Sequence, residues 1–173
     1  MVQNPETKIW QFSRVRDLGN EEPGDYAKAY QQLKQLEWLI GNWTATDGDQ
    51  TLTLNAKWMK NRAYIVVEQT IKTKGEEVLG ITMFIGHDVD SDIIHSWVFD
   101  TQGGRGEADW TRDGNSWNVE ASGLTADGLQ ASSKPTWKFI DDNTFEWKSV
   151  NRQLDGQPRA DIQLTYRKVP ATK

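Results

Sequence analysis

The stretch GEADWTRDGNSWNVEA, residues 106–121, decides the fold of this protein. Small or apolar residues alternate with charged or polar ones on both sides of a turn signal, Asp113-Gly114, as in an antiparallel hairpin with one buried face. A two-residue turn at Asp113-Gly114 places Trp110 opposite Trp117. The same register pairs small and apolar residues along the rest of the hairpin: Ala108 with Val119, and Gly106 with Ala121. One face of the hairpin is therefore apolar, and the other is charged.

Turn signals recur about every ten residues from Trp43 onward, which is the spacing of a sandwich or barrel. They are Asp47-Gly48-Asp49, Lys60-Asn61, Lys74-Gly75, Asp88 to Asp92, Gln102-Gly103-Gly104, Asp113-Gly114, Asp127-Gly128, Asp142-Asn143 and Asp155-Gly156. These turns join about ten strands, and no second helical pattern offers parallel crossovers. We predict an all-β, closed antiparallel up-and-down barrel, because closure removes the edges of such a meander.

One helical pattern precedes the strands, over residues 25–40. Asp25 is a suitable N-cap, Gly41 supplies a glycine stop, and apolar residues recur between them at helical spacing. The apolar stripe comprises Tyr26, Ala29, Tyr30, Leu33, Leu36 and Ile40. A closed barrel leaves apolar surface only at its ends. We therefore expect Tyr30, Leu33 and Leu36 of this stripe to cap one mouth.

The pattern divides the chain into three segments. Residues 1–24 form an N-terminal arm that ends at the breaker cluster Glu21-Glu22-Pro23-Gly24. Residues 25–168 form a single barrel domain that includes the helix, and residues 169–173 form a C-terminal tail. A short apolar patch around Trp10 in the arm suits an extra strand. The whole length, 173 residues, is enough for one domain with a full hydrophobic core.

The composition excludes several classes of function. The chain has no cysteine, which excludes disulfides and thiolate metal sites. Its net charge of −5, with both signs spread along the chain, argues against a nucleic-acid partner. No apolar run reaches the length of a membrane span, so we expect no membrane partner. As the chain is given we expect a cytoplasmic protein, or a secreted or periplasmic one if a signal peptide was removed.

Nine tryptophans are the unusual feature of the composition, beside five phenylalanines and four tyrosines. Extending the alternation of the first hairpin to its neighbours, with Thr101 to Gly104 as one loop, collects six of them on the inner face. The inner positions that we expect to bind a small apolar or aromatic molecule are Trp58, Gln69, Met83, His95, Trp97, Trp110, Trp117, Trp137, Trp147 and Asn151. Ligand sites usually combine such aromatic walls with a few polar groups.

His95 is the predicted inner residue most able to do chemistry, as a general base or a haem ligand. No carboxylate lies on its predicted face to orient it, which favours a structural role. Asp88 to Asp92 resembles a calcium loop, but Ile93 and Phe99 stand where such a loop needs Gly and Glu. We therefore predict no catalytic residue, no metal and no cofactor. If the protein is an enzyme, His95 and Asn151 are the candidates.

Two stretches carry a resemblance to known barrels. Gly41-Asn42-Trp43 resembles the Gly-x-Trp start of lipocalin and calycin barrels, in which an Arg or Lys of the last strand packs across that tryptophan; Arg167 occupies the corresponding place. The segments 96–104 and 110–114 are similar to uncharacterised bacterial barrel domains, found alone or behind a SnoaL-like domain, over residues 36–168. The resemblance implies the barrel fold and no particular activity.

Three functions fit these patterns. The first is binding of a small apolar or aromatic ligand inside a tryptophan-lined barrel. The second is a cyclase or isomerase that acts on an apolar substrate in the same cavity, which needs a titratable group at reactive distance. The third is a protein-interaction domain whose barrel is filled by its own side chains. An eight-stranded barrel is only just filled by its side chains and ten strands leave more room, which favours a cavity over a filled barrel.

Overall fold

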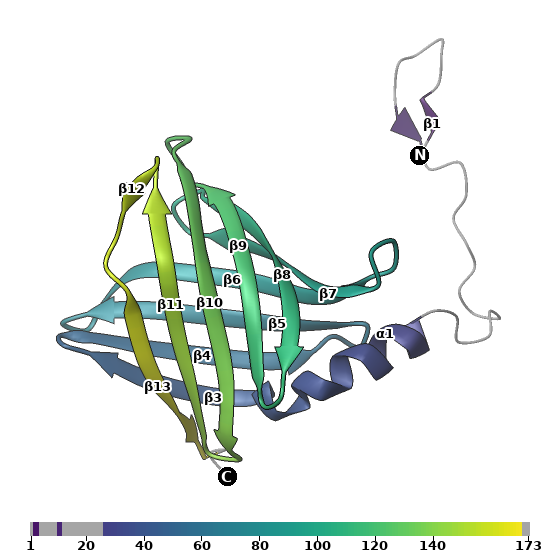
Figure 1. Cartoon of the computed structure of the whole chain (residues 1–173), viewed down its shortest axis with the longest axis horizontal. Coiled ribbons are helices and arrows are strands. Elements are labelled where there is room, and N and C mark those ends of the chain that lie inside the picture. The colour runs from purple at the N-terminus through teal and green to yellow at the C-terminus, as the bar shows by residue number, and fades with distance from the viewer. Residues whose placement is uncertain (1, 4–9, 12–25, 171–173) are drawn as a thin grey trace.

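In the computed structural model of this protein, residues 2–3, 10–11 and 26–170 are described. Ten strands pair in one closed antiparallel barrel (Figure 1), which confirms the predicted fold class. The barrel strands are β3 (Gly41–Asp47), β4 (Gln50–Trp58), β5 (Tyr64–Thr73), β6 (Glu76–Asp88), β7 (Ile93–Asp100), β8 (Arg105–Asp113), β9 (Ser116–Leu124), β10 (Gln130–Asp141), β11 (Thr144–Leu154) and β13 (Ile162–Val169). Pairing of β3 with β13 and of β10 with β11 completes the closure.

Three two-residue strands lie outside the barrel wall. β12 (Gln157–Pro158) pairs with the end of β11, and β1 (Val2–Gln3) pairs with β2 (Trp10–Gln11). Trp10 therefore lies in a strand, as the apolar patch predicts, and its partner is β1. The predicted cap Asp25 and the boundary between arm and barrel at residues 24 and 25 lie outside the described residues.

The helical segment closes one end of the barrel. It begins as the α-helix α1 (Tyr26–Leu33) and tightens into the 3₁₀ helix η1 (Lys34–Leu39). The tightening suits the sequence, because Leu33, Leu36 and Leu39 recur every three residues, the period of a 3₁₀ helix. All three are 0% exposed and belong to the hydrophobic core. The predicted cap is confirmed for Leu33 and Leu36, and Tyr30 packs its half-buried ring on the edge of Trp58 at 5.5 Å.

The predicted registers hold in one hairpin and shift in another. β4 and β5 pair as predicted, with Trp58 opposite Ile65. In the hairpin of β8 and β9 the turn is Gly114-Asn115, so Trp110 lies opposite Val119 instead of Trp117. The physical reason is that such a turn needs a positive φ at its first central residue, and Gly114 has a φ of 61°. A shift of the pairing by two keeps each side chain on its predicted face.

Strand β7 is reversed relative to the prediction. Ile94, Ser96 and Val98 point into the barrel, whereas His95 and Trp97, which the sequence pattern placed inside, lie on the outer face. Alternation alone does not decide which face of β7 points into the barrel, because this strand carries bulky residues on both faces. The predicted pairing of His95 with Trp110 is therefore wrong, and Ile94 holds that position.

The length of the loop between β7 and β8 causes this reversal. The predicted four-residue loop pairs Asp100 with Arg105, but in the structure Phe99 is the partner of Arg105. Asp100 belongs to the turn, where its carboxylate accepts a hydrogen bond from the backbone N–H of Gly104 at 2.9 Å. One additional loop residue is enough to move every side chain of the strand to the opposite face.

A bulge in β11 causes the second reversal. Asn151 has a φ of 51°, and the pairing with β10 shifts between Ser132 and Lys134. Asn151 is exposed as a result, which corrects the prediction that it lies on the inner face. Arg152 takes the inner position beyond the bulge, because the extra residue restores the alternation one place later.

Candidate functional site

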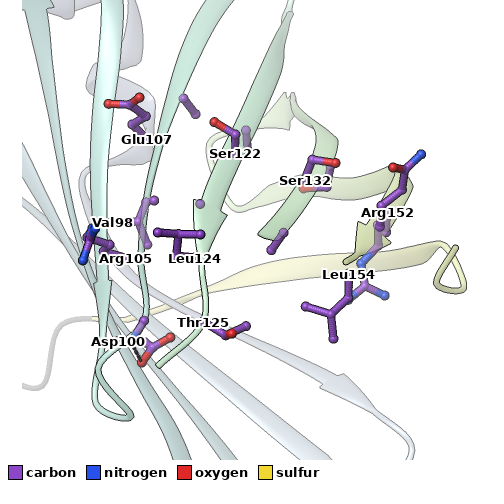
Figure 2. Close-up of a pocket in the computed structure, with 18 of the residues that line it drawn as sticks. Val98, Asp100, Arg105, Glu107, Ser122, Leu124, Thr125, Ser132, Arg152 and Leu154 are labelled. Atoms are coloured by element: carbon purple, nitrogen blue, oxygen red, sulfur yellow. Dashed lines mark hydrogen bonds between the residues drawn. The ribbon is translucent and has the colours of Figure 1, made fainter. Parts of the chain in front are cut away.

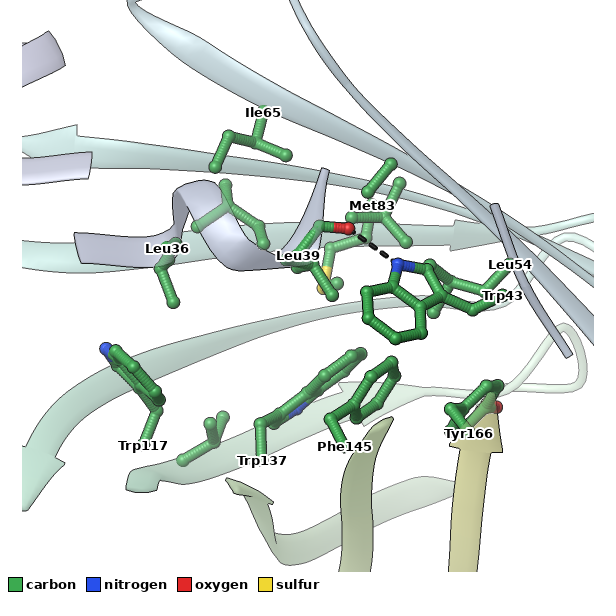
Figure 3. Close-up of a cluster of buried hydrophobic side chains, with 14 of the residues drawn as sticks. Leu36, Leu39, Trp43, Leu54, Ile65, Met83, Trp117, Trp137, Phe145 and Tyr166 are labelled. Carbon is green, nitrogen blue, oxygen red and sulfur yellow. Dashed lines mark hydrogen bonds between the residues drawn. The ribbon is translucent and has the colours of Figure 1, made fainter. Parts of the chain in front are cut away.

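The interior of the barrel has a filled half next to the helical segment. Figure 3 shows Leu36 and Leu39 of η1 above the aromatic rings of the barrel wall. The ring of Phe145 lies at the centre of this cluster, 4.6 Å from Tyr166 and 4.9 Å from Trp43. Trp38 of η1 adds a ring 5.3 Å from Trp117. Aromatic pairs of this kind contribute about 0.5–1.5 kcal/mol each beyond the area they bury, so they stabilise this half of the interior.

The other half of the interior is hollow. A cavity of about 350 Å³ lies there, with mainly apolar walls. Its aromatic walls are Trp110, Trp137 and Trp147, and its aliphatic walls include Leu52, Val67, Ile71, Ile81, Met83, Val98, Ile162 and Leu164. The three indoles come from β8, β10 and β11, so one side of the barrel supplies all of them. The cavity begins where the filled half ends.

Several small residues line the mouth of this cavity. A second hollow of about 550 Å³, drawn in Figure 2, shares Val98, Ala108, Ala121 and Arg152 with the cavity and continues it outward. Its wall includes Gly106 and Gly123, which lie opposite each other on β8 and β9. A Cβ atom added to Gly123 would lie 2.8 Å from the Cα of Gly106. The two backbones therefore approach too closely for side chains.

The polar groups around the cavity are mostly paired within the protein. Trp110 donates its indole N–H to Ser96 Oγ at 2.9 Å, and Gln69 Nε2 donates to the Tyr166 hydroxyl at 2.9 Å. Burial raises the pKa of the Tyr166 phenol above its ordinary value of about 10, so this hydroxyl stays protonated at neutral pH. It accepts from Gln69 and keeps its own proton to donate. The Tyr166 hydroxyl can therefore orient a ligand by donating a hydrogen bond to it.

His95 lies on the outer face, away from the cavity. Its Nδ1 is 2.7 Å from Asp109 Oδ1, and its Nε2 is 3.8 Å from Glu107 Oε2. The expectation that no carboxylate shares its face is therefore wrong, because the reversal of β7 places it beside the acidic outer face of β8. A histidine and carboxylate pair on the outer wall does not reach a molecule inside the barrel.

The second histidine, His87, lies on the inner face near the helical segment. Its side chain is 1% exposed, and its Nε2 is 2.9 Å from Asp92 Oδ1. Hydrogen bonds from Lys28 and then His87 lower the pKa of the Asp92 carboxyl. This contact connects α1, β6 and the β6–β7 turn, and it lies outside the cavity lining. Among the described residues, no group of three or more His, Cys, Asp or Glu is arranged to hold a metal ion.

The predicted ligand-binding residues fall into three groups. Gln69, Met83, Trp110, Trp137 and Trp147 line the cavity. Trp58 and Trp117 point inward but pack in the filled half, against Tyr30 and Trp38. His95, Trp97 and Asn151 lie outside the cavity. The sequence pattern did not select Ser96 and Arg152, since each depends on a loop length or a bulge.

The end of the last strand places a lysine across the first tryptophan. Lys168 Nζ lies 4.9 Å from the ring centroid of Trp43, in the position that the resemblance assigned to Arg167. Arg167 points the other way and donates to Thr144 Oγ1 at 3.1 Å, because inner residues of β13 have even numbers. A Cβ atom on Gly41 would lie 2.9 Å from Lys168 Cε. The glycine of Gly-x-Trp thus makes room for the cation.

This geometry is consistent with a lipocalin-like fold. No protein-family model matches the sequence, and no curated protein is significantly similar to it. None of the helices in the described part of the chain is long and apolar enough to cross a membrane.

Proposed function

We propose that this protein binds a small molecule with an apolar body inside the barrel. The observation that carries the proposal is the apolar cavity of about 350 Å³ that Trp110, Trp137 and Trp147 help to line. Its volume falls at the lower end of the range of about 300–1,000 Å³ that is usual for ligand sites. Each 100 Å² of apolar ligand surface removed from water contributes about 2.5 kcal/mol, so a small aromatic or aliphatic ligand can reach micromolar affinity.

Binding fits the residues of the cavity better than catalysis does. The sequence offers His95 and Asn151 to an enzyme, and both lie outside the cavity. No histidine belongs to the described cavity lining. The Tyr166 hydroxyl is a poor base at neutral pH because burial raises its pKa. These side chains favour retention of a ligand over proton transfer to it.

A neutral fluorescent probe tests the proposal. N-phenyl-1-naphthylamine should bind saturably and quench the tryptophan emission, because three indoles line the cavity. Ala108→Trp fills the cavity from one wall and should abolish this binding. Thr111→Trp adds the same ring at an exposed position of the same strand and should leave binding unchanged.

The result is read together with the thermal melting temperature of each variant. If Ala108→Trp lowers the melting temperature strongly, the smaller Ala121→Leu provides the test, since Ala121 lines the same cavity. Unsaturable or absent probe binding to the wild type, together with no small molecule retained in native mass spectrometry of the fresh protein, would refute a binding function.

A further inference from the structure

Two charged residues belong to the described lining of the apolar cavity, Asp47 and Arg152. Asp47 ends β3 and is exposed at the rim. Arg152 is half-buried and lines both the cavity and the hollow that leads out of it (Figure 2). A guanidinium cannot lose its charge at neutral pH, so a full positive charge lies at the junction of the cavity and its mouth.

Arg152 retains most of its hydrogen-bonding capacity. Among the described residues it makes one side-chain hydrogen bond, from Nη1 to the backbone oxygen of Ala160 at 2.6 Å, and no ion pair. A guanidinium carries five N–H donors in a planar fork that suits bidentate binding of a carboxylate. The hydrogen bond to Ala160 is solvent-exposed, so water hydrates this guanidinium in the free protein and it has no acidic partner among the described residues. An anionic group on the ligand would supply that partner.

Comparison with the other charged residues at the mouth makes Arg152 the candidate for binding an anionic ligand. The protein carries a net charge of −5, so its overall field does not attract anions. Arg105 and Arg159 line the mouth together with the acids Asp100 and Glu107, so the signs there are mixed. Of these cations, Arg152 is the one that also lines the apolar cavity.

We infer that the ligand of this barrel is an apolar carboxylic acid whose carboxylate binds Arg152 while its apolar body lies against Trp110 and Trp137. The inference rests on the proposed binding function and names its ligand class. A carboxylate suits this site because its two oxygens can accept two parallel N–H bonds from the guanidinium, which has five donors and uses one of them on the Ala160 carbonyl.

Calorimetric titration of the wild type and its variants with three probes of one chain length tests the inference. Decanoic acid carries the carboxylate, decanol is its neutral counterpart, and decyl phosphate is the larger anion. The wild type should bind decanoic acid about 10- to 100-fold more tightly than decanol, the range that a hydrogen bond to a charged group supports.

The variants separate Arg152 from its neighbours. Arg152→Gln should bring decanoic acid to the affinity of decanol and leave decanol binding unchanged, which also shows that the cavity is intact. Arg159→Gln, at the mouth but outside the cavity lining, should keep the preference for the acid. Arg152→Lys keeps the charge and should keep part of the preference, so it provides the test if the glutamine variant does not fold.

The other outcomes test the role of Arg152, the ligand class and the binding function separately. An unchanged preference for the acid in Arg152→Gln would show that Arg152 does not bind the carboxylate, while the binding function stands. Tighter binding of decyl phosphate than of decanoic acid would refute the carboxylate as the ligand class. Failure of all three probes to bind the wild type would refute the binding function itself.

Discussion

The reversal of β7 makes a direct prediction about Ser96. In the structure this serine is 1% exposed, and its hydroxyl accepts the indole N–H of Trp110 at 2.9 Å. Ser96→Ala removes the acceptor and leaves the indole N–H unpaired beside an apolar cavity. An unsatisfied buried donor costs about 1–3 kcal/mol. Because a water in the cavity can partly replace the hydroxyl, we expect a loss near 1–2 kcal/mol in the free energy of unfolding.

Urea unfolding, followed by circular dichroism and by tryptophan emission, measures this loss. Ser122→Ala on β9 is the matched control, since Ser122 is exposed and the same atom is removed. The control should change the free energy of unfolding by less than about 0.5 kcal/mol. In a domain of this size, 1 kcal/mol corresponds to about 2–4 °C in the melting temperature. Equal effects of the two substitutions would place Ser96 on the outer face and refute the reversal.

Three further predictions follow from the barrel ends and from Tyr166. Leu33→Asp places a charge in the cap and should lower the free energy of unfolding by several kcal/mol in urea titrations; a wild-type midpoint would show that the helical segment does not cover the mouth. Lys168→Met should cost about 0.5–1 kcal/mol more than Arg167→Met in the same assay, because Lys168 alone lies over an indole, and the reverse order would contradict this. The raised pKa of Tyr166 contributes stability that is fully present below pH 10 and is lost as the pH rises above it, since the unfolded phenol ionises first. Absorbance at 295 nm should show that one of the four tyrosines titrates only with unfolding and that Tyr166→Phe abolishes this late titration, whereas a late titration that persists in the variant would exclude Tyr166 as that residue.

The sequence by itself determined the barrel. Period-two alternation and regular turn signals predict ten antiparallel strands, because a strand with one buried face must alternate and a two-residue turn needs a glycine or similar residue. The pairing of Trp58 with Ile65 follows from the same argument. The helix, its buried leucines and the inward tryptophans Trp110, Trp137 and Trp147 are local patterns too, and they are visible without any tertiary information.

The tertiary structure decided which part of the interior is empty. Trp38 and the leucines of η1 fill one half of the barrel, and no local pattern says how far they reach. The tertiary structure also decided which side chains of β7 and of the end of β11 point into the barrel. The turn that Asp100 closes sets this for β7, and the bulge at Asn151 sets it for β11. A side-chain period of two makes face assignment sensitive to one residue, so each small irregularity moved a candidate residue: His95 to the outer face and Arg152 to the cavity.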